Sequence, residues 1–427
     1  MIQYRSTQSR QAGGVSFQEA LFRGQAPDGG LYVPDALPQI DPGRLRAGGF
    51  VERASGALGA WLDAELGADV TSTLCREAFD FPVPVSRLND DTWLLELFHG
   101  PTSAFKDFGA RFMARAMARL GEPGRRLTVL VATSGDTGSA VAHAFGGLAD
   151  TQVVLLYPAN KVSPLQEAQL TSVPANVHSV RVAGAFDDCQ AMVKAAFRDA
   201  NRAGELGLTS ANSINVGRLL PQLTYYVHAG LELEEAGAPL VVVPSGNLGN
   251  LTAGLLARLS GAPIAGFLAA ANRNDVFPRY LESGVLEARQ AVRTPSNAMD
   301  VGNPSNAARI VALYAGHFES LRRDVTGESV SDDETLATIR QTWEATGRFV
   351  CPHTAVGLAA RRRRGDPRPA VVLATAHPGK FAEIVREATG EEIALPETLA
   401  RALTSRRTPL DIPPDPLALL ELLRTLA

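Results

Sequence analysis

The chain has 427 residues, of which 45% are hydrophobic and 20% are charged, and its formal net charge is −4. This length and composition are those of a globular protein with about three domain-sized units, and they exclude a disordered or fibrous protein and a single small domain. Because 41 basic side chains are balanced by 45 acidic ones, no overall positive field attracts nucleic acid or an anionic membrane, and small-molecule ligands are expected.

The cysteines and the N-terminus indicate where the protein works. Cys75, Cys189 and Cys351 are odd in number and far apart, without the close pairs of zinc or redox motifs, so we expect a reducing compartment and no metal site. The N-terminus has no basic segment followed by an apolar run, and no stretch approaches the roughly 18 apolar residues of a membrane span. We therefore expect a cytoplasmic protein with no membrane partner and no nucleic-acid partner.

The two ends of the chain differ from its middle. Prolines and glycines mark turns between residues 27 and 42, and a helical stretch follows over 45–66. We expect a small N-terminal domain over residues 1–88. At the other end, prolines between 396 and 416 predict a loose tether to an amphipathic helix over 417–426, within a C-terminal extension over 395–427.

Between these ends, short apolar runs rich in β-branched residues alternate with helix-like segments. The expected strands cover 127–132, 152–157, 177–182, 240–244, 264–269 and 370–375, and the expected helices cover 110–120, 187–201, 219–235, 251–260 and 332–346. This alternation predicts the α/β fold class, with a parallel, doubly wound sheet in a core over residues 89–394. Ligands of such sheets bind beyond the carboxyl ends of the strands, so the residues after each apolar run are the first candidates for a site.

Lysine is scarce in this chain. Only four of the 41 basic residues are lysines: Lys106, Lys161, Lys194 and Lys380. Arginine can replace lysine as a surface charge, but its guanidinium stays protonated and cannot form the Schiff base that a deprotonated amine forms with an aldehyde. Each lysine is therefore a candidate for chemistry, and codon bias is the alternative explanation.

Lys106 has the most suggestive surroundings of the four. It follows a Gly-Pro turn in the segment 99–110 and lies near the start of a predicted helix. The positive end of a helix disfavours the ammonium form, and the neighbouring Phe105 and Phe108 can add desolvation, so the pKa of Lys106 is expected to be lowered. The pattern favours a nucleophile or base, and a purely structural role stays open.

Four further segments, three of them at predicted strand ends, carry polar groups. The segment 244–250, Pro-Ser-Gly-Asn-Leu-Gly-Asn, opens a helix and can cradle a phosphate, although it is neither a GxGxxG nor a Walker loop. The segment 132–138 offers hydroxyls and amides for a carboxylate, and 210–218 ends in Arg218, whose fork matches phosphate geometry. In 374–381, the hydroxyl of Thr375 can meet a ring nitrogen. Each loop alone could be structural, but together with an aldehyde-reactive lysine they fit pyridoxal 5′-phosphate.

These motifs, in this order, resemble the threonine synthase family. Val15–Ala20 and Ala26–Pro34 are similar to its N-terminal signature, in the longer form that has an extra N-terminal domain. The lysine motif alone is shared with threonine dehydratase and cysteine synthase, and the combination with the N-terminal segment is more specific. The resemblance implies the fold type II architecture of pyridoxal-phosphate enzymes, with two parallel-sheet α/β domains, a small N-terminal domain and a mobile small domain over about 130–205.

The resemblance also assigns roles to individual residues. Lys106 would form the Schiff base with the cofactor, Gly246, Asn247, Leu248, Gly249 and Asn250 would hold the cofactor's phosphate, Thr375 would meet the pyridine nitrogen, Ser134 and Thr137 would bind the substrate's carboxylate, and Ser213 and Arg218 its phosphate. Asp136 lies where shorter relatives have Asn near the phenolic oxygen of the cofactor, so its carboxylate has to be reconciled with the negative charge of that oxygen.

Other residues near these motifs have weaker assignments. Lys161, Asn212 and Asn215 are neighbouring candidates, and the family-like stretch 297–306 has no role that the sequence reveals. Lys194 is expected on a solvent face, and Lys380 at a helix start without a chemical role.

The activity that the resemblance implies is the conversion of O-phospho-L-homoserine and water to L-threonine and phosphate, by a monomer or homodimer. One alternative is a phospho-lyase of the same family that yields 2-oxobutyrate, and another is a relative that binds pyridoxal phosphate without turnover. A nucleotide-binding Rossmann module does not fit, because no GxGxxG follows an early strand with an acidic residue about 20 positions later.

Overall fold

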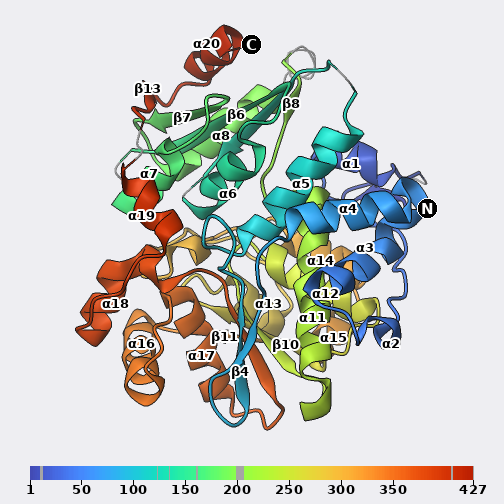
Figure 1. The fold of residues 1–427 in the computed structure, drawn as a ribbon, viewed down its shortest axis with the longest axis vertical. Helices are drawn as coiled ribbons and strands as arrows, with labels where there is room; N and C mark the ends of the chain where they lie inside the picture. The colour runs from blue at the N-terminus through green and yellow to red at the C-terminus, as the bar shows by residue number, and fades with distance from the viewer. Residues whose placement is uncertain are drawn as a thin grey trace.

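The computed structural model describes residues 1–9, 13–122, 124–133, 135–159, 162–198, 206–404 and 407–426. These residues form a small N-terminal unit and two larger sheets, each with helices on both faces (Figure 1). No helix among them combines the length and the apolar character that a membrane crossing requires.

The N-terminal unit contains a two-stranded antiparallel sheet and a group of helices. Strand β1 (Tyr4–Ser6) pairs with β2 (Tyr32–Pro34). Between them lies α1 (Phe17–Arg23), whose N-terminus is capped because the side chain of Ser16 accepts a hydrogen bond from the backbone of Glu19. Helices α2 (Pro42–Leu45), α3 (Phe50–Leu66) and α4 (Ala68–Ala78) follow.

The larger sheet has six strands in the order β11-β10-β9-β12-β4-β3. Their bounds are β3 (Val85–Arg87), β4 (Thr92–Glu96), β9 (Leu240–Pro244), β10 (Gly266–Ala271), β11 (Val325–Ser329) and β12 (Ala370–Ala374). All neighbours are parallel except β3, which forms an antiparallel pair with β4. The central strands β9, β10 and β12 are buried throughout, as expected for parallel strands that helices cover on both sides.

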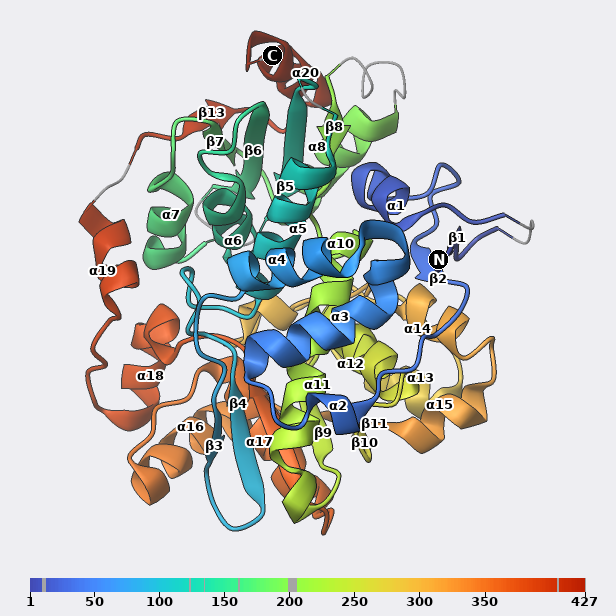
Figure 2. The ribbon, with the colours of Figure 1, turned by 45° about the vertical axis from the view of Figure 1, so that its right-hand side comes forward.

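The smaller sheet has five strands, all parallel, in the order β13-β7-β6-β5-β8. These are β5 (Leu127–Ala132), β6 (Thr151–Pro158), β7 (Val177–Val182), β8 (Leu208–Thr209) and β13 (Leu410–Ile412). Helices α6 (Asp136–Phe145) and α7 (Pro164–Thr171) cover one face, and α8 (Phe186–Arg198) and the C-terminal α20 (Pro416–Leu426) cover the other (Figure 2).

The remaining helices connect and cover the sheets. They are α5 (Lys106–Leu120), α10 (Val216–Leu219), α11 (Leu223–Glu232), α12 (Gly249–Leu259), α13 (Val276–Ser283), α14 (Ala307–Leu313), α15 (Phe318–Asp324), α16 (Asp332–Thr346), α17 (Pro352–Arg364), α18 (Ala382–Thr389) and α19 (Glu397–Thr404), with 3-10 turns η1 (Leu220–Gln222), η2 (Glu234–Ala236), η3 (Asn297–Met299) and η4 (Pro378–Phe381). Helices α5, α11 and α12 contribute to the core on one side of the larger sheet, and α16 and α17 to the core on the other.

The predicted fold class is confirmed, with two parallel sheets in place of the one that periodicity alone suggests. Strands β5, β7 and β9 and helix α16 have the predicted bounds. The helix expected over 219–235 is instead divided into α10, η1, α11 and η2, because Pro221 has no backbone N–H to continue the helical hydrogen bonds.

The prediction of a loose tether near the C-terminus is wrong. The segment contains α19 and β13, and β13 adds to the edge of the smaller sheet with Leu410 opposite Val180. An edge strand offers unpaired backbone groups, which a short partner can satisfy without an apolar side-chain pattern. The sequence therefore gives no hydrophobic signal for this strand.

Candidate active site

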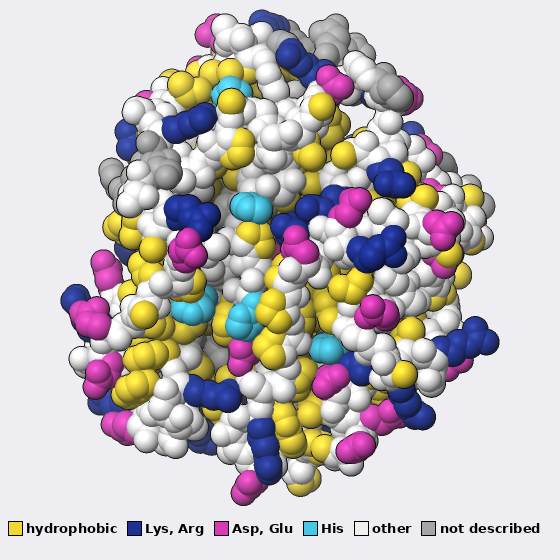
Figure 3. Space-filling view, viewed as in Figure 1, with side chains coloured by type: hydrophobic (Ala, Val, Ile, Leu, Met, Phe, Trp, Pro, Cys, Tyr) yellow, Lys and Arg dark blue, Asp and Glu magenta, His cyan; other side chains and the backbone are white. Residues whose placement is uncertain are grey.

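A cavity of about 3220 Å³ lies where strands of both sheets end. Thr133 follows β5, Ser245 follows β9 and Thr375 follows β12, and all three line the cavity. This is the edge at which ligands of parallel sheets bind. On the face shown in Figure 3, histidine side chains gather near the middle of the molecule, between the parts that contain the two sheets.

Lys106 is the first residue of α5, and the loop before it is paired with the segment after β12. The backbone N–H of Phe105 donates to the carbonyl oxygen of Thr375 at 2.9 Å, and that of His377 donates to Ser103 at 3.0 Å. These two hydrogen bonds hold Lys106 and Thr375 at the same end of the larger sheet, although they are distant in the sequence.

The amine of Lys106 is buried and its Nζ lies 4.7 Å from the ring centre of Phe105. Burial lowers the pKa of Lys106 to about 8; the charge of Asp136 opposes this shift, and those of Arg218 and Lys380 reinforce it. A substantial fraction of the amine is therefore unprotonated close to neutral pH, which is the state that a nucleophile or base requires.

The predicted phosphate loop lies between β9 and α12. Leu248 adopts a left-handed conformation with φ 61°, and α12 begins at the next residue. The side chain of Asn247 donates to Ser213 Oγ at 2.7 Å and accepts from the backbone N–H of Ser305 at 2.6 Å. The Asn247 side chain thus anchors the loop, and the backbone amides at the helix start are the groups that fit an anion.

Asn250 has one half of its side-chain amide fixed and the other half without a partner. The hydroxyls of Tyr225 and Tyr226 donate to its Oδ1 at 2.6 and 2.7 Å. Its buried Nδ2 has no hydrogen-bond partner among the residues that the structure describes, and Asn250 lines the cavity. A ligand oxygen at this position would satisfy the amide.

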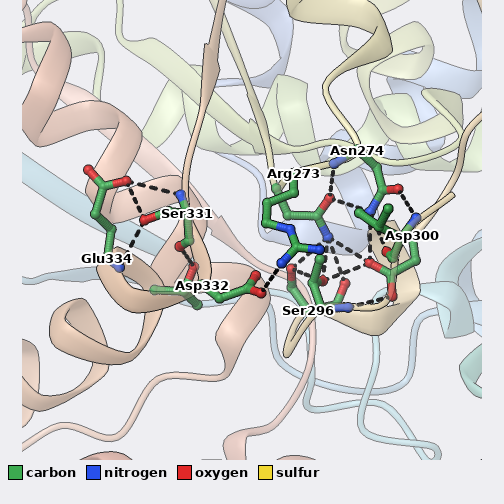
Figure 4. A network of polar contacts seen from close by, with 11 residues as sticks. Arg273, Asn274, Ser296, Asp300, Ser331, Asp332 and Glu334 are labelled. Atoms are coloured by element: carbon green, nitrogen blue, oxygen red, sulfur yellow. Dashed lines mark hydrogen bonds and ion pairs between the residues drawn. The ribbon is translucent and has the colours of Figure 1, made fainter. Parts of the chain in front are cut away.

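The stretch 297–306, for which sequence analysis found no role, forms a wall beside the phosphate loop. A Cβ added to Gly246 would lie 2.8 Å from Cα of Met299, so only glycine allows the two segments to come this close. Asp300 anchors the stretch by accepting hydrogen bonds from the Thr294 hydroxyl at 2.7 Å and from the side-chain amides of Asn272 at 2.9 Å and Asn274 at 3.0 Å (Figure 4).

Arg218 reaches the cavity from α10, which packs closely against α5. A Cβ added to Gly109 would lie 2.5 Å from the carbonyl oxygen of Arg218, so this packing also depends on a glycine. The guanidinium is buried; it donates to the carbonyl oxygen of Ala211, and its Nε has no partner among the described residues. Burial lowers the pKa of Arg218 to about 10, so the group is a cation in need of an anion.

Asp136 begins α6 and faces Lys380 across the cavity. Nζ of Lys380 lies 2.8 Å from Oδ1 of Asp136, and it donates to the carbonyl oxygen of Thr102 at 2.9 Å. Burial alone would raise the pKa of Asp136, yet the charges of Lys380 and Lys106 hold it well below its usual range. Lys380 lies in η4, directly before α18, where a helix start was expected, and it is also a buried ionic group of the cavity.

The structure brings most of the other sequence candidates to the same cavity. Thr137, Asn212 and Ser213 line it, whereas Asn215 caps α10 by accepting from the N–H of Gly217 at 2.8 Å. Lys194 is solvent-exposed, as expected. Ser134 and Lys161 lie outside the described residues.

Sequence reasoning missed the cavity residue His353, and it named the segment 132–138 without giving Thr133 a role of its own. His353, at the start of α17, is buried, and its Nε2 accepts from the backbone N–H of Ala298 at 3.2 Å. Burial lowers its pKa to about 4, so the imidazole is neutral. Thr133 Oγ1 accepts from the N–H of Gly138 at 2.8 Å and so caps α6. A Pro at the first turn of α17 was the only signal near His353, and it marks a helix start without indicating a site.

The donors that line the cavity fit pyridoxal phosphate. They include an amine with a lowered pKa, a loop of backbone amides at the N-terminus of an 11-residue helix, and a neutral hydroxyl at the end of β12. Three buried polar atoms that line the cavity, Arg218 Nε, Asn250 Nδ2 and Asn297 Oδ1, have no partner within the described part of the chain. Buried polar atoms are rarely left unpaired, so their presence indicates a bound polar ligand.

Comparisons with known proteins agree with this chemistry. Residues 79–377 match the family model of pyridoxal-phosphate-dependent enzymes, residues 3–79 match that of the threonine synthase N terminus, and residues 354–420 match that of the threonine synthase C-terminal region. Threonine synthase of Haemophilus influenzae is 43% identical over 389 residues, which are 90% of this chain and 91% of that protein.

Solved structures are similar over the full length. Threonine synthase from Escherichia coli has a TM-score of 0.94 at 40% identity, covering 100% of both chains. Threonine synthase from Brucella melitensis, solved with bound pyridoxal phosphate, has a TM-score of 0.93 at 34% identity and covers 100% of this chain and 99% of its own.

Proposed function

The chain belongs to the threonine synthase family of pyridoxal-phosphate-dependent enzymes, and from this membership we propose that it converts O-phospho-L-homoserine and water to L-threonine and phosphate. The observation that carries the proposal is the buried amine of Lys106, which lies in one cavity with the loop 246–250 and the buried cation Arg218. A substrate and a cofactor that each carry a phosphate require two anion sites beside one reactive amine.

When bound, pyridoxal phosphate supplies an aldehyde that condenses with amines and a ring that withdraws electrons from the α-carbon of the substrate. Lys106 would bear the cofactor until the amino group of the substrate displaces it. The freed amine would then act as the base that moves protons at Cα and Cβ. Its pKa of about 8 suits both directions of proton transfer near neutral pH.

The loop 246–250 would hold the phosphate of the cofactor through its backbone amides and the positive end of α12. Ser213 and Arg218 would bind the phosphate of the substrate, which leaves during the reaction. The unpaired Nε of Arg218 supports this role, since a phosphate oxygen would complete its hydrogen bonding. Thr137 and Ser134 would bind the substrate's carboxylate.

Thr375 would place a neutral hydroxyl at the pyridine nitrogen. A carboxylate at this position would keep the nitrogen protonated and strengthen electron withdrawal, so a hydroxyl should limit side reactions. The variant Thr375→Asp is expected to lower the ratio of threonine to 2-oxobutyrate severalfold, measured by quantifying both products. An unchanged ratio would contradict this role.

The reaction also requires that one water molecule reach Cβ while bulk solvent is kept out. The cavity is bounded by Thr133 and Asp136 at the smaller sheet and by Lys106 and Thr375 at the larger sheet. A closing movement of the smaller domain, about residues 130–205, would bring these walls together and control access of water.

The proposal also includes the cellular location and the oligomeric state of the enzyme. Cys75, Cys189 and Cys351 are free and buried, which supports a reducing, cytoplasmic location. We expect a monomer or a homodimer, which light scattering during gel filtration distinguishes.

The test is an assay of the purified protein with O-phospho-L-homoserine, in which phosphate, threonine and 2-oxobutyrate are each quantified. Equal amounts of phosphate and threonine, with no product from Lys106→Ala, are expected. Phosphate together with 2-oxobutyrate would instead identify a phospho-lyase, and the absence of phosphate would identify a relative that binds the cofactor without turnover.

A further inference from the structure

The ion pair between Lys380 and Asp136 joins the ends of the two sheets. Asp136 begins the helix that follows β5 in the smaller sheet, and Lys380 lies in η4 after β12 in the larger one. The Lys380 side chain is 0% exposed and that of Asp136 is 4% exposed, with 2.8 Å between the charged atoms. Removing two charges from water is costly, so a pair this deeply buried calls for a reason beyond stability.

The pair belongs to the electrostatic surroundings of Lys106. Three charged groups on other elements act on the Lys106 amine: Asp136 on α6, Arg218 on α10 and Lys380 on η4. His353 on α17 also interacts with it and is neutral. Asp136 is thus the anion of this group, and its carboxylate is already compensated by Lys380.

Asp107, the residue after Lys106, does not take the place of Asp136. Its carboxylate accepts hydrogen bonds from the backbone N–H of Thr102 at 2.9 Å and from the Thr102 hydroxyl at 2.6 Å. Burial raises its pKa to about 6, so the group is still largely ionised at pH 7, but among the charges that act on Lys106 the only carboxylate is that of Asp136. The anion that matters for Lys106 is therefore Asp136.

We propose that Lys380 is a positioning residue whose ammonium group cancels the carboxylate of Asp136, so that the amine of Lys106 faces a neutral pair. The inference rests on the proposed function in one respect, because Lys106 is taken as the amine that carries the cofactor. It explains how an aspartate can occupy this position. Alone, the carboxylate would hold Lys106 in its protonated form.

The hydrogen bond from Lys380 to Thr102 adds a mechanical link. The carbonyl oxygen of Thr102 accepts from Lys380, while the N–H and hydroxyl of the same residue hold Asp107 beside Lys106. The test must therefore separate the charge of Lys380 from its support of the loop. Removing the negative charge of Asp136 and removing the positive charge of Lys380 should shift the pKa of Lys106 in opposite directions, which a loss of loop support would not do.

The experiment measures the pKa of Lys106 in the full-length protein without cofactor. Acylation of Lys106 by acetic anhydride is followed from pH 6 to 11 by mass spectrometry of the peptide that carries it. In Lys380→Met, Lys106 faces a lone carboxylate, and its pKa is expected to rise by about one unit or more. In Asp136→Asn it faces a lone ammonium, and its pKa is expected to fall.

The double variant Asp136→Asn/Lys380→Met completes the cycle. Its Lys106 pKa is expected to return to within about half a unit of the original, since both charges are gone. Shifts of the same sign in the two single variants, or no shift in either, would overturn the proposal. Loss of loop support alone cannot produce shifts of opposite sign that cancel in the double variant.

A second readout uses the protein loaded with pyridoxal phosphate. The pH midpoint of the change in cofactor absorbance is expected to move in the same directions, and Lys380→Met is expected to bind the cofactor roughly tenfold more weakly, as a one-unit shift implies. Lys194→Met, which removes an exposed lysine of α8, is the matched control and should change neither quantity. If Lys380→Met fails to fold, Asp136→Asn and the double variant still decide the outcome.

Failure of this inference can be told apart from failure of the proposed function. Threonine formation with an unchanged Lys106 pKa in both single variants would leave the function standing and remove the role of Lys380. Shifts of the Lys106 pKa in opposite directions in the two single variants, without threonine formation, would support the role of Lys380 and contradict the proposed function.

Discussion

Two ion pairs near the two ends of α17 differ in their exposure to solvent. In its last turn, Arg363 pairs with Glu334, and the two side chains are 42% and 45% exposed (Figure 4 shows Glu334 at the start of α16). Near its amino end, the cavity holds Lys380 and Asp136, which are 0% and 4% exposed. Water screens the first pair and not the second, so similar contacts have very different consequences when one partner is lost.

Lysine and arginine are used differently at these two kinds of place, although some arginines, such as Arg218 and Arg309, are also buried. Arginines such as Arg363 and Arg368 form the surface pairs, for which a permanently charged, forked group is sufficient. Lys106 and Lys380 lie in the cavity, where a compact ammonium group can be buried and, in Lys106, deprotonated. The scarcity of lysine made all four lysines candidates for the site, and two of them, Lys106 and Lys380, lie in the cavity.

The largest effect is expected from the variant Lys380→Met, which removes one partner of the buried pair. It leaves the Asp136 carboxylate buried without a partner, and we expect a loss of about 3–5 kcal/mol in the free energy of unfolding. Urea denaturation of the cofactor-free protein measures it. The double variant with Asp136→Asn should regain most of the loss, and equal stability of the single variant and the original protein would contradict the expectation.

Arg218→Met tests a buried cation whose partner is the substrate. Loss of a buried charge that contacts phosphate is expected to remove about 2–5 kcal/mol of transition-state binding, which corresponds to a decrease of roughly 30- to 4000-fold in kcat/KM for O-phospho-L-homoserine. Steady-state kinetics measures the change. A variant within threefold of the original protein would show that Arg218 does not bind the leaving phosphate, and Arg363→Met is the control at the surface.

The burial of Lys106 also predicts how the free energy of unfolding depends on pH. Burial lowers the pKa of Lys106 from 10.5 to about 8, so protonation of its amine is less favourable in the native state than in the unfolded chain. The resulting decrease in the free energy of unfolding is largest below pH 8. Between pH 8 and 10.5 the unfolded chain binds more protons than the native one, so this decrease disappears as pH rises.

The cofactor-free variant Lys106→Met should therefore be more stable than the original protein at pH 7, and the difference should shrink towards pH 10. Urea denaturation of both proteins at the two pH values measures it, and titration of all other groups cancels in the comparison. A difference that stays constant would contradict the lowered pKa.

The smallest effect is expected at the surface. Arg363→Ala should change the free energy of unfolding by less than about 1 kcal/mol, and the change should decrease further in 1 M salt. Denaturation at low and high ionic strength measures both. A loss comparable to that of Lys380→Met would remove the distinction between the two pairs.

Sequence reasoning reached the fold and the loops of the site because both have local signals. Apolar runs fixed the bounds of β5, β7 and β9, and the polar loops after β5, β9 and β12 were found by their position after these runs. Strand β13 was not predicted because its three residues are largely exposed, and because the hydrogen bonds from Arg181 of β7 to Asp411 join residues that are distant in the sequence.

The remaining site features depend on contacts between distant segments. The pairing of Lys380 with Asp136 was not expected, because Asp136 begins α6 beside the smaller sheet and no spacing rule connects the two residues. Asn247 was expected at the cofactor's phosphate, and the structure adds that its side chain contacts Ser213 and the backbone of Ser305. Such pairings are decided by the tertiary structure, so local sequence patterns carry no sign of them.

The pairing of β13 with β7 has a consequence for how the two sheets can move. The chain passes between them after β4 through α5, again between β8 and α10, and a third time between α18 and β13. Two crossings define an axis about which one sheet can rotate, and a third crossing limits the angle of that rotation. Under the proposed movement of the smaller domain, the C-terminal segment would therefore limit how far the two sheets can separate.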